Sequence, residues 1–282
     1  MTILSATRCF CIKMLLFITI NVILIGLSSS SVINAPDSIF FNENAEIIGM
    51  TAVDLDASPC MKEECNLGNL VADSIRYEYL VEHATNTEVP NVIVLVQGKN
   101  LKGMIEKGSN ITRENLIGTM SKDGSLVKAK LTGAIIKDVL DKSVAKYNQK
   151  NGSPDFVQVA GAFIEFNFTM EAGKRLVSSK VLCVDCNGFI EMKDTEKYDI
   201  VMTEDLSKAS FSNEQFTGLN TTEYSSLEKF IIKNQIVYPA VEGRITLHNV
   251  DDAPSSAVTM KMSVLLMGVV LIFHQFVSFV RS

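Results

Sequence analysis

Four of the six cysteines in this 282-residue chain offer its clearest chemistry, since Cys9 and Cys11 lie in the N-terminal segment that is interpreted below as a signal peptide. Cys60 and Cys65 lie close together in the sequence, and Cys183 and Cys186 form a Cys-x-x-Cys pair. In an oxidising compartment, an even number of cysteines at short spacings predicts disulfides, and four cysteines allow three pairings. We predict the local pairing, Cys60–Cys65 with Cys183–Cys186. A four-cysteine zinc site is the alternative, because Cys-x-x-Cys is also a zinc-ligand spacing.

The N-terminal segment predicts that the chain enters such a compartment. Residues 1–35 contain no acidic residue, and Arg8 and Lys13 precede an apolar run over residues 14–27 that small residues follow. This order is typical of a secretory signal peptide. An uncleaved signal anchor is the alternative, but the run is shorter than the ~20 residues that a membrane span needs.

Residues 251–282 predict a lipid anchor. The stretch 263–280 is apolar apart from His274, Gln275 and two serines, and small-residue clusters beginning at Asp251 and at Ser255 lie just upstream. A small-residue site, a short spacer and a hydrophobic tail form the attachment signal for a GPI anchor. Asp251 and Ser255 are therefore the candidate attachment residues. A C-terminal transmembrane helix is the alternative, although it would place polar side chains in the middle of the membrane, where their burial is energetically unfavourable.

Three glycosylation sequons agree with secretion, at Asn110, Asn167 and Asn220. Removing residues 1–35 and 258–282 takes away four basic residues and no acidic one, which leaves a net charge of about −10. Such a surface repels phosphate backbones, so nucleic acid is not an expected partner.

Residues 36–250 are interpreted as one domain in which strands and helices interleave. Residues 67–83, capped by Asn66, carry apolar side chains at three- and four-residue steps, which predicts a helix. Residues 92–96 read as a buried strand. Further strands are expected at 47–55, 125–131, 156–160, 162–169, 177–183 and 198–203, and further helices at 112–116, 133–146 and 227–234. Because no strict βαβ order appears, we predict an α+β fold with a mixed sheet and packed helices.

Five blocks of the sequence occur in the order of the motifs of one protein family. Residues 60–73 resemble the family's cysteine-flanked C-N-x-G-N-L-x-x-D segment, and residues 156–161 its F-L-Q-V-x-G strand. Residues 131–147 are similar to its L-x-G helix, residues 181–186 to its C-x-x-C hairpin, and residues 238–245 to its closing strand. Together these blocks resemble the C-terminal domain of the 5'-nucleotidases. The resemblance covers about residues 45–248 and implies the fold of that domain.

The resemblance also implies a two-domain enzyme. In that family an N-terminal metallophosphatase domain holds two divalent metals, and the C-terminal domain holds the nucleoside. Two-metal hydrolysis needs a cluster of ligands. Here only a short segment separates the predicted signal peptide from the C-terminal domain, and neither His83 nor His248 lies in the family's N-H-[DE] or D-x-H context. We expect no catalytic residue, no metal and no cofactor, and interpret both histidines as surface residues.

The nucleoside-binding positions that the resemblance assigns have changed. The family's N-G-G-G-I-R loop reads Q-G-K-N-L-K at residues 97–102, and lysine does not reproduce the planar fork of arginine. Lys122 stands where one stacking aromatic is expected, and the second falls in residues 208–216. Losing two stacking faces at ~1–3 kcal/mol each would weaken binding about 10²-fold. The candidate contacts of this degenerate nucleotide site are Gln97, Gly98, Lys102 and Phe211.

We interpret the chain as a cell-surface, GPI-anchored, non-catalytic binding or interaction protein. The expected partners are a second copy of the chain or a full-length 5'-nucleotidase paralogue, with weak nucleoside or nucleotide binding. One alternative is a 5'-nucleotidase that converts AMP to adenosine with a missing or partner-supplied metal domain. Another is a soluble scavenger of nucleosides.

Overall fold

The computed structural model describes residues 46–85, 89–183, 186, 188–211 and 213–250. The predicted signal peptide, the hydrophobic tail and the candidate attachment residues Asp251 and Ser255 lie outside the described residues. Within the described ranges, no helix is both long enough and apolar enough to cross a membrane.

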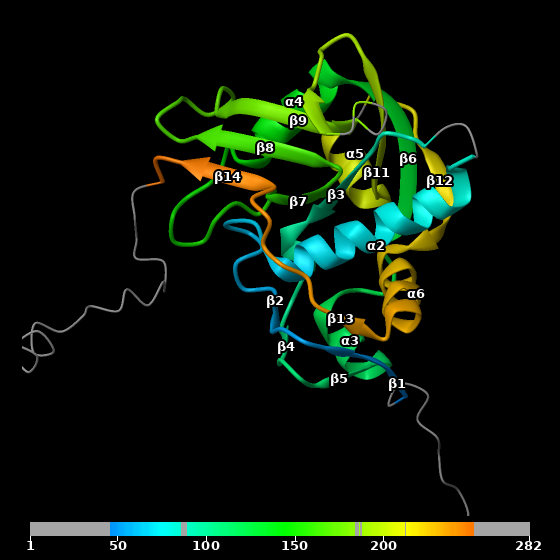
Figure 1. The fold of residues 1–282 in the computed structure, drawn as a ribbon. Coiled ribbons are helices and arrows are strands. Elements are labelled where there is room, and N and C mark those ends of the chain that lie inside the picture. The colour runs from blue at the N-terminus through cyan, green and yellow to red at the C-terminus, as the bar shows by residue number, and fades with distance from the viewer. Residues whose placement is uncertain (1–45, 86–88, 184–185, 187, 212, 251–282) are drawn as a thin grey trace, which may run out of the picture. The chain divides into compact units, whose positions relative to one another are not determined.

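The largest sheet has five strands in the order β12-β6-β11-β3-β7 (Figure 1). Strands β11 and β3 are parallel, and the other neighbours are antiparallel. The strands are β3 (Val92–Gln97), β6 (Ser125–Thr132), β7 (Val157–Ala160), β11 (Lys197–Thr203) and β12 (Thr217–Thr222). The mixed sheet confirms the α+β prediction.

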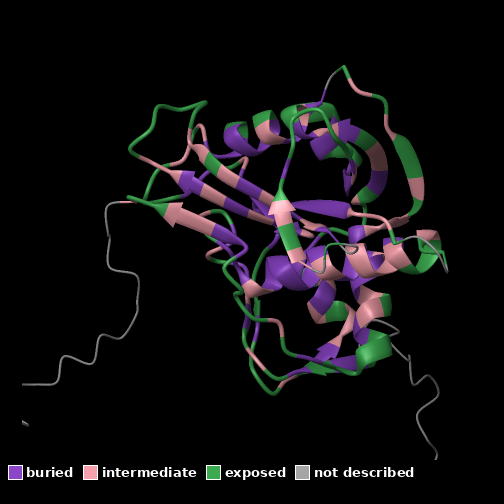
Figure 2. Ribbon diagram, turned by 45° about the horizontal axis from the view of Figure 1, so that its top comes forward, coloured by how far each residue is buried: buried purple, intermediate pink, exposed green. Residues whose placement is uncertain are grey.

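Helices cover both faces of this sheet, which explains why β3 is buried along its whole length. Because side chains alternate along a strand, Val94 belongs to the core beneath α2 (Asn66–His83) and α6 (Glu223–Asn234). The next residue, Leu95, belongs to the core beneath α4 (Gly133–Ser143) and α5 (Glu204–Ser210). Figure 2 shows buried residues concentrated in the strands and in the first part of α2.

Three smaller sheets flank the five-stranded one. A four-stranded sheet has the order β10-β9-β8-β14, a three-stranded sheet the order β13-β1-β5, and β2 pairs with β4. Their strands are β1 (Ile47–Thr51), β2 (Leu55–Asp56), β4 (Met104–Ile105), β5 (Asn110–Thr112), β8 (Ala162–Asn167), β9 (Leu176–Cys183), β10 (Gly188–Glu191), β13 (Ile236–Val237) and β14 (Ile245–His248). The short helices are α3 (Arg113–Thr119) and the 3₁₀ turn η2 (Gly98–Asn100).

The structure differs from the sequence expectations at several elements. Helix α6 begins at Glu223, four residues before the start expected at residue 227, and the N-cap of α2 is Cys65 in place of Asn66. The strand expected over residues 47–55 is two strands, β1 and β2, in different sheets. Helix α5 was not predicted, although its start is clear locally: the Thr203 hydroxyl accepts a hydrogen bond from Leu206 N at 3.3 Å, and two acidic residues fill the first turn.

Both predicted disulfides, Cys60–Cys65 and Cys183–Cys186, are present. Gln158, from the block at residues 156–161, fastens the first of these loops. Its fully buried side chain donates hydrogen bonds to the carbonyls of Cys60 and Glu63, both at 2.8 Å, and accepts one from Cys65 N at 3.0 Å. This pairing satisfies backbone groups that the tight disulfide loop leaves without partners.

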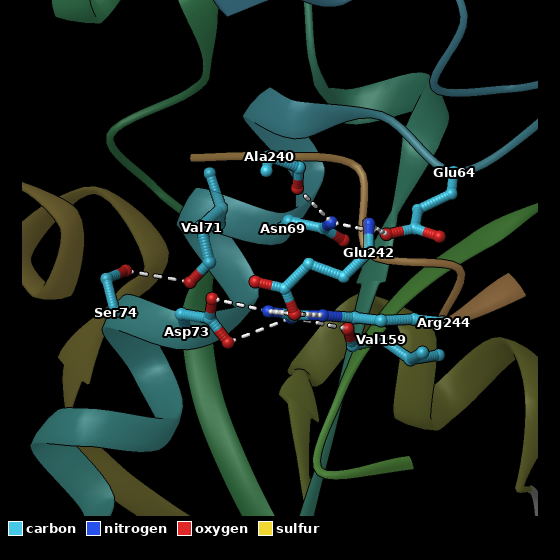
Figure 3. A network of polar contacts seen from close by, with 9 residues as sticks. All are labelled: Glu64, Asn69, Val71, Asp73, Ser74, Val159, Ala240, Glu242 and Arg244. Carbon is cyan, nitrogen blue, oxygen red and sulfur yellow. Dashed lines mark hydrogen bonds and ion pairs between the residues drawn. The ribbon is translucent and has the colours of Figure 1, made fainter. Parts of the chain in front are cut away.

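The segment that enters β14 is held by a polar network around Arg244 (Figure 3). The Arg244 guanidinium donates to both carboxylate oxygens of Asp73 on α2, at 2.8 and 2.7 Å. It also donates to the Val159 carbonyl on β7 at 3.1 Å and to Glu242 at 2.9 Å. Arg244 therefore joins α2, β7 and the closing segment through charge-assisted bonds.

Candidate functional site

The end of β3 and the η2 turn position three of the predicted contacts. Gln97 is buried at the end of β3, Gly98 begins η2, and Lys102 follows it as an exposed residue. A Cβ on Gly98 would lie only 2.0 Å from the Cys60 carbonyl oxygen. The absence of a side chain at this position is therefore required by packing against the disulfide loop.

The predicted contacts line different cavities. Lys102 lines a cavity of about 260 Å³ that also contains Glu223, which we call the Glu223 cavity. Gln97 lines a neighbouring cavity of about 630 Å³, and Lys99 lines both. Phe211 lines a third, of about 500 Å³. The structure thus places Gln97, Lys102 and Phe211 in three separate cavities, and the cavities of Gln97 and Phe211 each share lining residues with the Glu223 cavity.

The aromatic candidates are engaged with the protein itself. Phe211 is only 4% exposed and belongs to the core that contains Leu206. Its ring lies edge-on to that of Phe216, with centroids 5.6 Å apart. This packing gives Phe211 a structural role in the described conformation.

Lys122 stands at the position for which the resemblance implies a stacking aromatic. Its ammonium lies 5.2 Å from the centroid of the Tyr224 ring, within reach of a cation–π interaction. The position therefore carries a cation, bound to the start of α6, in place of an aromatic face.

Glu223 is the site residue that sequence reasoning missed. It is the first residue of α6, is 3% exposed, and its backbone N donates to the Gly124 carbonyl at 3.0 Å. Among the described residues, its buried Oε1 has no hydrogen-bond partner. Burial raises the pKa of the Glu223 carboxyl from 4.5 to about 7. An acidic residue directly after Thr222 reads as an exposed first-turn residue, so no local signal indicates its burial.

Charges of both signs surround Glu223 in its cavity. Lys99 and Lys102 are exposed lysines that form no ion pair with the described residues. Asp123 and Asp205 also line the cavity. Glu204 lines it too, but is paired with Lys208 at 2.7 Å. A ligand in this cavity would contact both carboxyl groups and unpaired ammonium groups.

No metal-ligand set is assembled in the described part of the chain: no three His, Cys, Asp or Glu side chains lie together in a way that could hold a metal ion. His83 is partly buried, with Nδ1 2.8 Å from the Tyr79 carbonyl and Nε2 2.7 Å from Lys128 Nζ. The exposed His248, on β14, lies 2.9 Å from Glu165 on the neighbouring strand β8. These residues do not fit the two-metal centre that the resemblance implies for the family's other domain.

The predicted glycosylation sites differ in accessibility. Asn110 and Asn220 are exposed. Asn167 is partly buried, and its Oδ1 accepts hydrogen bonds from Thr169 N at 3.0 Å and from Asn249 at 2.9 Å. Modification of all three sites stays a prediction.

Comparisons with known proteins agree with this architecture. A family model described as the 5'-nucleotidase C-terminal domain matches residues 47–210. Protein 5NUC of Lutzomyia longipalpis is 29% identical over 221 residues, covering 73% of this chain and 39% of that protein. Human 5'-nucleotidase is 28% identical over 217 residues, covering 72% of this chain and 37% of that enzyme.

A solved structure shows the same fold. The crystal structure of a 5'-nucleotidase precursor from Thermus thermophilus superposes with a TM-score of 0.64 at 22% identity, covering 72% of this chain and 40% of that one. The chain therefore spans about two-fifths of the length of the relatives that it matches.

Proposed function

Because the chain belongs to the family of 5'-nucleotidase C-terminal domains, we propose that it is a non-catalytic binding or interaction protein held at the cell surface by a C-terminal lipid anchor. The observation that carries the binding part of this proposal is that the predicted nucleoside contacts do not share one cavity. Gln97, Lys102 and Phe211 line three cavities. In addition, an ammonium group replaces one stacking ring at Lys122.

The partner that fits this proposal is a second copy of the chain or a full-length 5'-nucleotidase. Nucleoside binding is expected to be weak, because base–aromatic stacking at ~1–3 kcal/mol per ring is missing. The acidic surface argues against nucleic acid. No cofactor is required for a binding role.

The purified full chain is expected not to hydrolyse AMP, even with added zinc. Phosphate release from AMP is the measurement, with a full-length 5'-nucleotidase as the positive control. A Lys122→Phe, Lys102→Arg variant should recover some adenosine affinity by restoring a stacking face and a guanidinium, yet remain inactive, since neither change adds a metal ligand. Zinc-dependent turnover that a chelator abolishes would instead support the AMP-hydrolysing alternative.

Secretion is supported by the two disulfides, which persist in oxidising compartments, and by the predicted signal peptide. The lipid anchor is motivated by the small-residue clusters at Asp251 and Ser255 before an apolar tail. We propose the cell surface as the resulting location.

Treatment of intact cells with a phosphatidylinositol-specific phospholipase is expected to release the protein into the medium. Immunoblotting of cells and medium measures the released fraction, and a known transmembrane protein serves as the control that stays behind. Retention on the cells, together with a peptide map that contains residues 260–282, would mean that a membrane helix holds the chain.

A further inference from the structure

We propose that the Glu223 cavity binds a small zwitterion, whose ammonium group is accepted by the Glu223 carboxylate and whose anionic group is held by Lys99 and Lys102. This inference rests on the proposed loss of nucleoside recognition, since Lys102 is one of the positions that the family resemblance assigns to a nucleotide. It adds a ligand class of its own, defined by the charges of the cavity.

The Glu223 carboxyl is the reason to expect a hydrogen-bond donor on the ligand. The residue lines the cavity, is only 3% exposed, and has no hydrogen-bond partner for its Oε1 among the described residues. Leaving a buried acceptor unsatisfied costs about 1–3 kcal/mol, and more for a charged group. A ligand ammonium can donate three hydrogen bonds and carries the complementary charge. An ammonium group beside the Glu223 carboxylate would offset part of the desolvation penalty that opposes ionisation of this buried group.

The two lysines of the cavity are the reason to expect an anionic group on the ligand. Lys99 and Lys102 line the same cavity and have no carboxylate partner in the part of the chain that the structure describes. Other lysines nearby are engaged: Lys142 pairs with Asp138 at 2.5 Å, and Lys146 with Asp155 at 3.0 Å. The two free ammonium groups therefore remain available to a carboxylate or a phosphate.

The remaining charges select a ligand that carries both signs. Asp123 and Asp205 line the cavity and would repel a purely anionic ligand, whereas Lys99 and Lys102 would repel a purely cationic one. The cavity volume of about 260 Å³ lies just below the roughly 300–1,000 Å³ of pockets for larger ligands. A small zwitterion satisfies both the charge pattern and the size.

Calorimetric titration of the full chain, purified in detergent, tests the proposal with four probes: phosphoethanolamine, ethanolamine, inorganic phosphate and AMP. Phosphoethanolamine is expected to bind about tenfold or more tightly than ethanolamine or phosphate alone, because only it engages both ends of the cavity. Glu223→Gln keeps the shape of the side chain but removes its charge, and Lys102→Met removes one exposed ammonium. Each should weaken phosphoethanolamine binding about tenfold or more.

Glu106→Gln and Lys197→Met are the matched controls. Both residues are exposed and lie outside the cavity, so these variants should bind as the wild type does. Unfolding curves of all variants check that they are folded. Unchanged phosphoethanolamine affinity in both cavity variants, or no heat of binding with the wild type, would overturn the zwitterion site while leaving the proposed function intact. Tight AMP binding that Lys102→Met abolishes would overturn both.

Discussion

Arg244→Met is expected to lower the free energy of unfolding by about 3 kcal/mol. Breaking a buried ion pair by removing one partner costs about 3–5 kcal/mol, and the lower end applies because the Asp73 side chain is 40% exposed. Arg244 itself is 7% exposed and joins Asp73, Val159 and Glu242 (Figure 3). Methionine fills part of the volume but leaves the Val159 carbonyl without this donor. Urea unfolding followed by circular dichroism measures the loss.

The control for this prediction is Arg113→Met. Arg113 also forms ion pairs, with Glu46 and with Glu228, but its side chain is 21% exposed, against 9% for that of Arg244. Its loss should shift the urea midpoint much less, because solvent screens exposed pairs. Equal shifts in the two variants would mean that Arg244 does not join α2 to the closing segment in the way that the network indicates.

Glu223→Gln is expected to change how the stability of the protein depends on pH. The carboxyl has a folded-state pKa of about 7, raised from 4.5 by burial, so the folded state binds the proton more tightly than the unfolded state. The stability that this proton contributes is complete below about pH 4.5 and is lost as the pH rises to about 7 and just above. The shift corresponds to about 3 kcal/mol.

Glutamine does not titrate, so the variant should lack this loss. The free energy of unfolding of Glu223→Gln minus that of the wild type should therefore be larger at pH 8 than at pH 5, by up to about 3 kcal/mol. Urea midpoints of both proteins at the two pH values, without added ligand, give the difference and cancel the titration of other groups. Glu106 is exposed, so the control variant Glu106→Gln should have the same urea midpoint as the wild type at both pH values. A difference between Glu223→Gln and wild type that stays constant with pH would contradict the buried-carboxyl account.

The sequence predicted those features that depend on neighbouring residues. The apolar stripe of residues 67–83 predicted most of α2, and the apolar run at 92–96 predicted β3, because helix and strand periods are local properties. The local cysteine pairs were predictable for the same reason: residues three and five positions apart meet whatever the rest of the chain does. The interleaving of strands and helices without a strict βαβ order predicted the α+β class, and the family resemblance then implied the fold of the domain.

Only the tertiary structure decided which polar side chains are buried and what they contact. Gln158 meets the loop at residues 60–65, and Arg244 meets Asp73, across 95 and 171 positions of sequence respectively. Glu223 is buried because α6 begins against Gly124, which no pattern around Thr222 indicates. Gln97, Lys102 and Phe211 open into different cavities for the same reason. The environment of a charged or aromatic side chain is set by segments distant in the chain, and these meet only once the sheets have assembled.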